Sequence, residues 1–123
     1  MRDLKKVKKS YDYQNDVLFV RSKESSYHKS ISIHRDIILD LNKKGDILGF
    51  EIHHASDAFN IPKAHLQNIE GVRGEITVSE EYLEFKINII TKVRNKTQQR
   101  GTYNLNNQRP KSLQAQKQNL ATT

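Results

Sequence analysis

Residues 31–56 read ISIHRDIILDLNKKGDILGFEIHHAS, and this stretch predicts a β-hairpin around which the rest of the chain is arranged. Its turn is the polar NKKG segment at residues 42–45, which ends in a glycine that takes positive φ without steric strain. This four-residue loop pairs Leu41 with Asp46 and Ile37 with Phe50, whereas a three-residue loop splits the apolar set across both faces. With the longer loop, one face carries Ile33, Ile37, Leu39, Leu41, Leu48, Phe50 and Ile52.

Length and composition restrict the number of domains and the kinds of site that the chain can form. A chain of 123 residues forms one domain with a modest core. It has no cysteine, which excludes disulfides and thiolate metal sites. No apolar run approaches the roughly 18 residues that span a membrane, and the basic N-terminus lacks the apolar region of a signal peptide. We therefore expect a cytoplasmic protein without membrane contact.

The positive charge is concentrated at the two ends of the chain. The net charge is +7, and residues 1–9 hold five basic and one acidic side chain. Residues 10–95 hold eleven basic and thirteen acidic side chains, and residues 96–123 hold five basic and none acidic. This last segment also has ten Gln or Asn among its 28 residues, a composition that buries too little apolar surface to fold.

Weaker signals flank the central hairpin. Residues 7–21 predict a shorter hairpin with its turn at 13–16, and residues 22–30 predict an exposed loop. Asn60 and Pro62 open a short helix that Gly71 ends, and residues 76–89 predict a third hairpin. The expected fold class is α+β: an antiparallel sheet of about six strands from three hairpins, with one short helix on one face. Residues 1–95 form this domain, and residues 96–123 form a disordered, flexible C-terminal tail.

Several short motifs lie within residues 7–59: YD at 11–12, DVLFVR at 16–21, ILD at 38–40, GDILGFEI at 45–52 and AS at 55–56. With this spacing the segment resembles a family of small prokaryotic proteins known as domain of unknown function 2283. Phe19 stands where that family often has tyrosine, and His53 and His54 replace residues that are more often aliphatic or acidic. The family has no established activity. Some members are similar to partners encoded beside small toxin-like proteins, so the resemblance implies an antitoxin-like role.

Two sets of residues are candidate binding sites. In the predicted register His34 lies opposite His53 and Asp36 opposite Glu51, which places four metal ligands on one outer patch. The alternative is a solvated polar face. The basic ends could clamp a polyanion such as a nucleic acid, and otherwise serve solubility and the protection of edge strands. The side chains of this clamp are Lys5, Lys6, Lys8, Lys9, Arg100, Arg109, Lys111 and Lys117.

The expected function is that of a small binding module for a protein partner. The sequence has no nucleophile motif and no glycine-rich phosphate loop, so it predicts neither an enzyme nor a cofactor. Nucleic-acid binding through the basic termini is the alternative function. A homo-oligomer is left open.

Overall fold

The computed structural model describes residues 4–23, 26–93 and 97–122. Within these ranges, nine strands form one sheet in the order β3-β4-β5-β2-β1-β9-β6-β7-β8. The elements in chain order are β1 (Leu4–Asp12), β2 (Val17–Ser22), β3 (Tyr27–His34), β4 (Ile37–Asn42), β5 (Ile47–His53), α1 (Ala55–Phe59), α2 (Lys63–Leu66), β6 (Ile69–Val78), β7 (Tyr82–Val93), β8 (Thr97–Gln108) and β9 (Gln116–Ala121).

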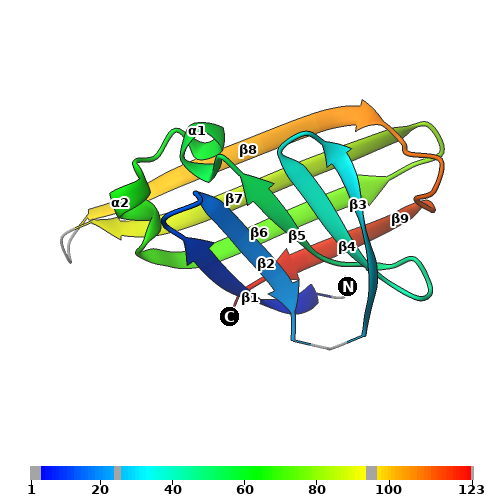
Figure 1. Ribbon diagram of the computed structural model, residues 1–123, viewed down its shortest axis with the longest axis horizontal. Coiled ribbons are helices and arrows are strands. Elements are labelled where there is room, and N and C mark those ends of the chain that lie inside the picture. The colour runs from blue at the N-terminus through cyan, green and yellow to red at the C-terminus, as the bar shows by residue number, and fades with distance from the viewer. Residues whose placement is uncertain (1–3, 24–25, 94–96, 123) are drawn as a thin grey trace.

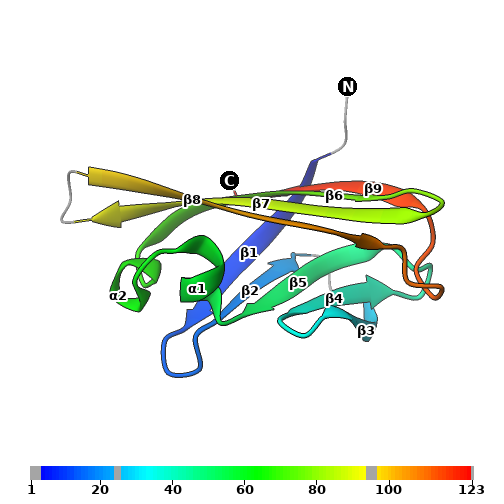
Figure 2. The same ribbon diagram turned by 90° about the horizontal axis from the view of Figure 1, so that it is seen from above.

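The sheet curls so that its two halves face each other. Figure 2 shows β2 to β5 in one layer and β6 to β9 in the other, with β1 crossing between them. We call these the N-terminal and C-terminal layers. Strand β1 pairs with β2 in antiparallel fashion and, through Leu4 to Lys6, with β9 in parallel fashion. The helices α1 and α2 contact β8 and β7 at one end of the molecule (Figure 1).

The predicted α+β architecture is wrong. The sheet has nine strands rather than six and is mixed rather than antiparallel, and the two helices are too short to cover a face. The apolar face of the N-terminal layer is covered instead by the C-terminal layer. The Phe50 and Phe85 rings, one from each layer, meet edge to face with their centroids 5.0 Å apart. Neither helix in the described ranges has the length and apolar character needed to cross a membrane.

The central hairpin is present, but its register and extent differ from the prediction. The predicted strand from residue 31 to 41 breaks at Arg35 and Asp36, and its first half forms β3 beside β4. Ile37 pairs with Ile52 rather than with Phe50, and a bulge near Asp40 reduces this shift from two residues to one, so that Leu41 pairs with Ile47 rather than with Asp46. A shift of two residues returns each side chain to its original face. The predicted buried grouping of Ile37 with Phe50 and Ile52 is therefore confirmed, whereas beyond the bulge Ile47 joins the core in place of the predicted Leu48.

The other two predicted hairpins are confirmed as β1–β2 and β6–β7. The predicted loop at residues 22–30 is only partly a loop, because β3 already begins at Tyr27. Gly71 does not end a helix but lies inside β6. The predicted helix after Asn60 is only the four residues of α2, with Pro62 as its N-cap, whereas α1 precedes Asn60, where no helix was predicted.

The predicted disordered tail is wrong. Its residues form β8 and β9, and Leu113 and Leu120 are almost completely buried. In β8 the residues Gly101, Tyr103 and Leu105 alternate with polar residues and face the core beside β7. Asn104 and Asn106 occupy outward positions between these residues, so composition alone hides a one-sided strand.

Leu120→Ala should lower the free energy of unfolding by about 2–5 kcal/mol, because it removes a buried side chain from the centre of the sheet. Lys117→Ala in the same strand is the matched control, since its exposed side chain should change stability by less than about 0.5 kcal/mol. Urea denaturation of both variants measures the difference. Equal and small effects would contradict the position of β9.

Candidate functional site

The eight basic residues predicted to form one clamp are spread over both layers. Lys5, Lys6, Lys8 and Lys9 lie on β1, Arg100 on β8 and Lys117 on β9. Arg109 and Lys111 lie in the β8–β9 connection. Arg109 supports the structure there, because its Nε donates to the Glu80 carbonyl at 2.8 Å and its Nη1 to the Leu113 carbonyl at 2.8 Å. The structure therefore keeps the β1 lysines together but separates them from the C-terminal set.

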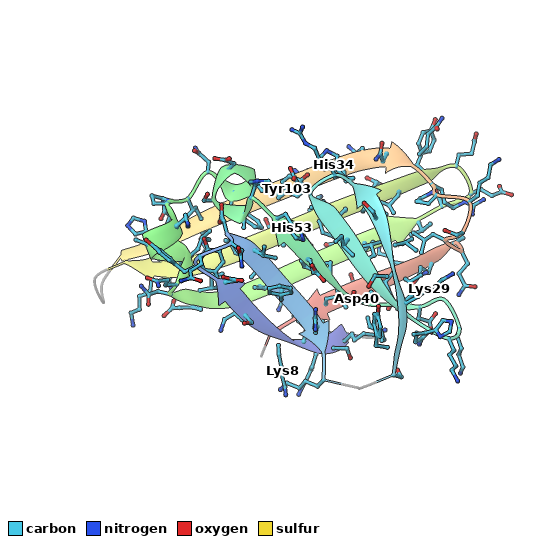
Figure 3. The ribbon with its side chains drawn as sticks, viewed as in Figure 1. Lys8, Lys29, His34, Asp40, His53 and Tyr103 are labelled. Carbon is cyan, nitrogen blue, oxygen red and sulfur yellow. The ribbon has the colours of Figure 1, made fainter. Side chains whose placement is uncertain are left out.

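The four predicted metal ligands do not meet as predicted. His53 Nε2 lies 3.2 Å from a Glu51 carboxylate oxygen, whereas Asp36 is 3.0 Å from His54 Nδ1. His34 lies at the end of β3 and accepts a hydrogen bond from the Asp36 amide. Figure 3 labels both His34 and His53. Among residues 4–23, 26–93 and 97–122, no three His, Cys, Asp or Glu side chains are grouped so that they could hold a metal ion.

A hydrogen-bonded cluster around Asp16 joins the first turn to α1. Asp16 takes a left-handed conformation with φ of 56°. Its carboxylate accepts a hydrogen bond from the Tyr11 hydroxyl at 2.6 Å and from the Ser56 hydroxyl at 2.6 Å. It also accepts from the Ser56 amide at 3.0 Å, in the first turn of α1. These three residues belong to the motifs at 11–12, 16–21 and 55–56, and their contacts give those motifs a structural role.

The Asp16 cluster changes the pKa values of its members. Burial would raise the pKa of Asp16, but the hydrogen bonds from Ser56 and Tyr11 outweigh burial and hold the pKa below 3.8. Burial and the bond to Asp16 raise the pKa of the Tyr11 hydroxyl above its usual range. The charged carboxylate is therefore the form that the fold stabilises.

Asp16→Asn should lower the melting temperature at neutral pH. A folded pKa below the unfolded one contributes stability that is present above pH 3.8 and is lost as pH falls through the folded value. Asparagine tolerates the left-handed conformation, so the change tests charge and hydrogen bonding rather than backbone strain. Thermal unfolding from about pH 7 to pH 2 should show the two proteins converging in acid. Asp57→Asn, an exposed change on α1, is the control. A gap that is constant across this range would contradict the assignment.

A second polar network lies on the outer face of the N-terminal layer. Asp40 is 5% exposed and accepts a hydrogen bond from the Ser30 hydroxyl at 2.8 Å. The Arg21 guanidinium lies 3.8 Å from Asp40 and 3.5 Å from Glu51. Because Ser30 gives its proton to Asp40, the Tyr27 hydroxyl, 3.0 Å away, is the donor to Ser30. The network thus connects four strands and orients Tyr27.

Gly49 lies beside this network, and its lack of a side chain leaves space there. It pairs with Asp40 on one side and with Arg21 on the other. A Cβ at this position would lie 2.1 Å from the Val20 carbonyl oxygen, a distance that no side chain permits. The bare backbone leaves a hollow of about 350 Å³, which is lined by Arg21, Ser22, Tyr27, Ser30, Asp40, Leu48, Gly49 and Glu51.

A larger hollow adjoins this one and is basic. Its volume is about 620 Å³, and it shares Tyr27 and Leu48 with the smaller hollow. The lining residues are Lys5, Ser26, Tyr27, Asn42, Lys43, Lys44, Asp46 and Leu48. We call it the lysine hollow. Lys5 reaches across to the Ile47 carbonyl at 3.2 Å, and the Tyr27 ring is 62% exposed.

Further lysines lie on β1 and β3 and just after β2, and they do not line the lysine hollow. The Lys23 amide donates to the Lys6 carbonyl at 3.3 Å, Lys8 pairs with Arg21, and Lys29 pairs with Leu41. Figure 3 shows Lys29 and Asp40 toward the end of the layer where β4 turns into β5. Sequence reasoning named only the β1 lysines of this group. It missed Tyr27, because the position of this residue depends on β3 pairing beside β4, and it assigned Lys43 and Lys44 only to the turn at residues 42–45.

Comparison with known proteins places the chain in a family. Residues 8–56 match the family model described as "Protein of unknown function (DUF2283)". The chain belongs to this family. The DUF2283 segment extends from β1 to the start of α1 and contains both the Asp16 cluster and the Arg21–Asp40 network. The predicted resemblance is confirmed, and no solved structure matches the chain.

Two relatives are archaeal. A protein of Methanosarcina mazei named "Putative hypoxanthine phosphoribosyltransferase" is 35% identical over 77% of this chain and 76% of its own length. An uncharacterised protein of Methanocaldococcus jannaschii is 41% identical over 50% of this chain and 52% of its own length. The first name is that of an enzyme. It contradicts the sequence prediction that the chain is not an enzyme, which is corrected here.

Proposed function

We propose that this DUF2283 protein is a nucleic-acid-binding module that holds a single strand in the lysine hollow. The observation that carries the proposal is the presence of three lysines and an exposed tyrosine in one hollow of about 620 Å³. Nucleic-acid binding was the alternative function in the sequence analysis, which assigned it to the two chain ends. The binding site proposed here lies instead at one end of the N-terminal layer. A cytoplasmic location is part of the same proposal.

The charge distribution supports a polyanion as the ligand. Phosphate contacts with Lys and Arg supply most of the affinity in sequence-independent binding, because they release condensed counterions. Lys5, Lys43 and Lys44 line the hollow itself. Asp46, the acidic residue in the lining, makes hydrogen bonds with Asn42 within the β4–β5 turn.

Tyr27 supports a single strand over a duplex. Bases of a single strand can stack on an aromatic ring, whereas those of a duplex are already stacked on each other. The Tyr27 ring is held through Ser30 and Asp40, so its orientation is set before a ligand arrives. A pre-oriented ring loses less conformational entropy on binding than a free one.

Lys43→Ala with Lys44→Ala should weaken binding and flatten its salt dependence. Each lost phosphate contact on a single strand removes about 0.7 from the slope of log K against log salt, so the pair should remove about 1.4. Fluorescence anisotropy with a labelled oligothymidylate at several salt concentrations measures this slope. Lys86→Ala with Lys117→Ala is the matched control, with the same charge change on the outer face of the C-terminal layer. Equal losses in both double variants, or no binding at low salt, would overturn the proposal.

Tyr27→Ala should weaken binding by about 1–3 kcal/mol while leaving the salt slope unchanged, because stacking involves no counterion release. Tyr82→Ala is the control, since Tyr82 is also 62% exposed but lies on β7. The same anisotropy titration reports both variants. If Tyr27→Ala has no effect while the lysine variant does, the lysines bind phosphates without stacking, and the single-strand part of the proposal fails.

A protein partner added as a further strand is the second candidate function. Strand β8 is twelve residues long, ends the sheet order and pairs with β7 alone among the described strands. Such an edge offers free main-chain groups to an extended peptide. Partner addition at β8 would protect the amides of residues 97–108 from hydrogen exchange. Nucleic acid in the lysine hollow would instead protect Tyr27 and the β4–β5 turn.

A further inference from the structure

The outer face of the C-terminal layer contains a second basic hollow, separate from the proposed nucleic-acid site. Its volume is about 410 Å³. The residues that line it are Gly71, Val72, Arg73, Asn88, Ile89, Ile90, Arg100, Gly101, Thr102 and Thr122. They come from β6, β7 and β8 and from the residue after β9. We call it the arginine hollow.

Sheet register brings the two arginines to this hollow from different strands. Arg73 on β6 pairs with Asn88, and Arg100 on β8 pairs with Ile90 two residues further along β7. Only β7 separates the two strands, so strand spacing and this two-residue offset place the arginine Cα atoms about 12 Å apart. Both guanidinium groups are exposed, and neither has a hydrogen bond or ion pair to another described residue.

The neighbouring groups leave hydrogen-bond donors for a ligand. The Thr102 hydroxyl donates to the Asn88 carbonyl oxygen at 2.7 Å, which fixes the amide and leaves its NH₂ group available. No described residue in the lining is acidic. Glu70, a nearby carboxylate on β6, is engaged by Lys92 at 3.7 Å and by Gln98 at 3.2 Å. Gly71 has no side chain to fill the space above Ile90, its partner on β7.

We propose that the arginine hollow binds a small phosphate monoester. Two guanidinium groups and one amide supply donors from several directions, and a tetrahedral phosphate has enough oxygens and negative charge to accept from all three. A carboxylate has two oxygens in one plane and cannot bridge the same set. The apolar side chain of Ile90, which lies on the outward face of β7, suits the carbon skeleton of the ester. This site is independent of the lysine hollow and of the function proposed for it.

The test is an NMR titration of the full-length ¹⁵N-labelled protein with inorganic phosphate, ribose 5-phosphate and sodium acetate at equal ionic strength. We expect both phosphates to shift the amide signals of Gly71, Arg73, Asn88, Arg100 and Thr102, with the ester binding more tightly. Arg73→Gln with Arg100→Gln should weaken this binding by about tenfold or more. Lys86→Gln with Lys117→Gln, on the same face and with the same charge change, should leave it within about twofold.

Three results would overturn the inference. The first is an absence of localised shifts with either phosphate. The second is an equal loss of binding in both double variants, which would indicate attraction to net charge rather than a site. The third is acetate binding as tightly as the phosphates. Circular dichroism confirms that each variant is folded. Oligonucleotide binding by the Arg73 and Arg100 variant should stay close to that of the wild type, so failure here is distinguishable from failure of the lysine hollow.

Discussion

The insertion of β9 between β1 and β6 is the interaction on which the rest of the structure depends. Strand β9 pairs with β1 in parallel fashion at Leu4 to Lys6 and with β6 in antiparallel fashion along its whole length. Without β9, the two layers would lack the hydrogen bonds that make them one sheet. Leu120 contributes its buried side chain at this junction. Beyond the strand, the Thr122 amide donates to the Val72 carbonyl at 3.0 Å and extends the connection to β6.

The same segment supports the proposed binding site. The Gln116 side chain accepts a hydrogen bond from the Ile47 amide at 2.8 Å and donates to the Gly45 carbonyl at 2.8 Å. These bonds fix the β4–β5 turn that carries Lys43 and Lys44. Through Gln116, strand β9 therefore helps to fix the shape of the lysine hollow, although Lys117 of the same strand does not line it. Binding at the hollow and integrity of the sheet are expected to depend on each other.

The sequence predicted those features that depend on neighbouring residues. The three hairpins follow from turn residues and alternation. The buried faces of β4 and of β5 at Phe50 and Ile52 follow from alternation too, because a two-residue shift keeps each side chain on its face, but the bulge at Asp40 puts Ile47 in the core instead of Leu48. The C-terminal strands were missed because Asn and Gln outnumber their apolar residues and obscure Tyr103, Leu105 and Leu120. The parallel pairing of β1 with β9 joins residues more than a hundred positions apart, and no local pattern encodes it. The site was missed for the same reason, since Tyr27, Lys5 and Lys44 line one hollow only when β3 is paired with β4 and β1 with β2. The lysines of β1 were foreseen because charge is visible in the sequence itself.

Hydrogen exchange of the backbone amides of β9 tests the central position of this strand most directly. In native conditions a strand paired on both sides exchanges only when the whole domain unfolds. The amides of Asn119, Leu120 and Ala121, the part of β9 that is paired on both sides, should therefore exchange as slowly as that of Ile76 in the neighbouring β6, with free energies of exchange close to that of global unfolding. Exchange of these three amides at the rates of an unstructured peptide, while β6 remains protected, would contradict the account.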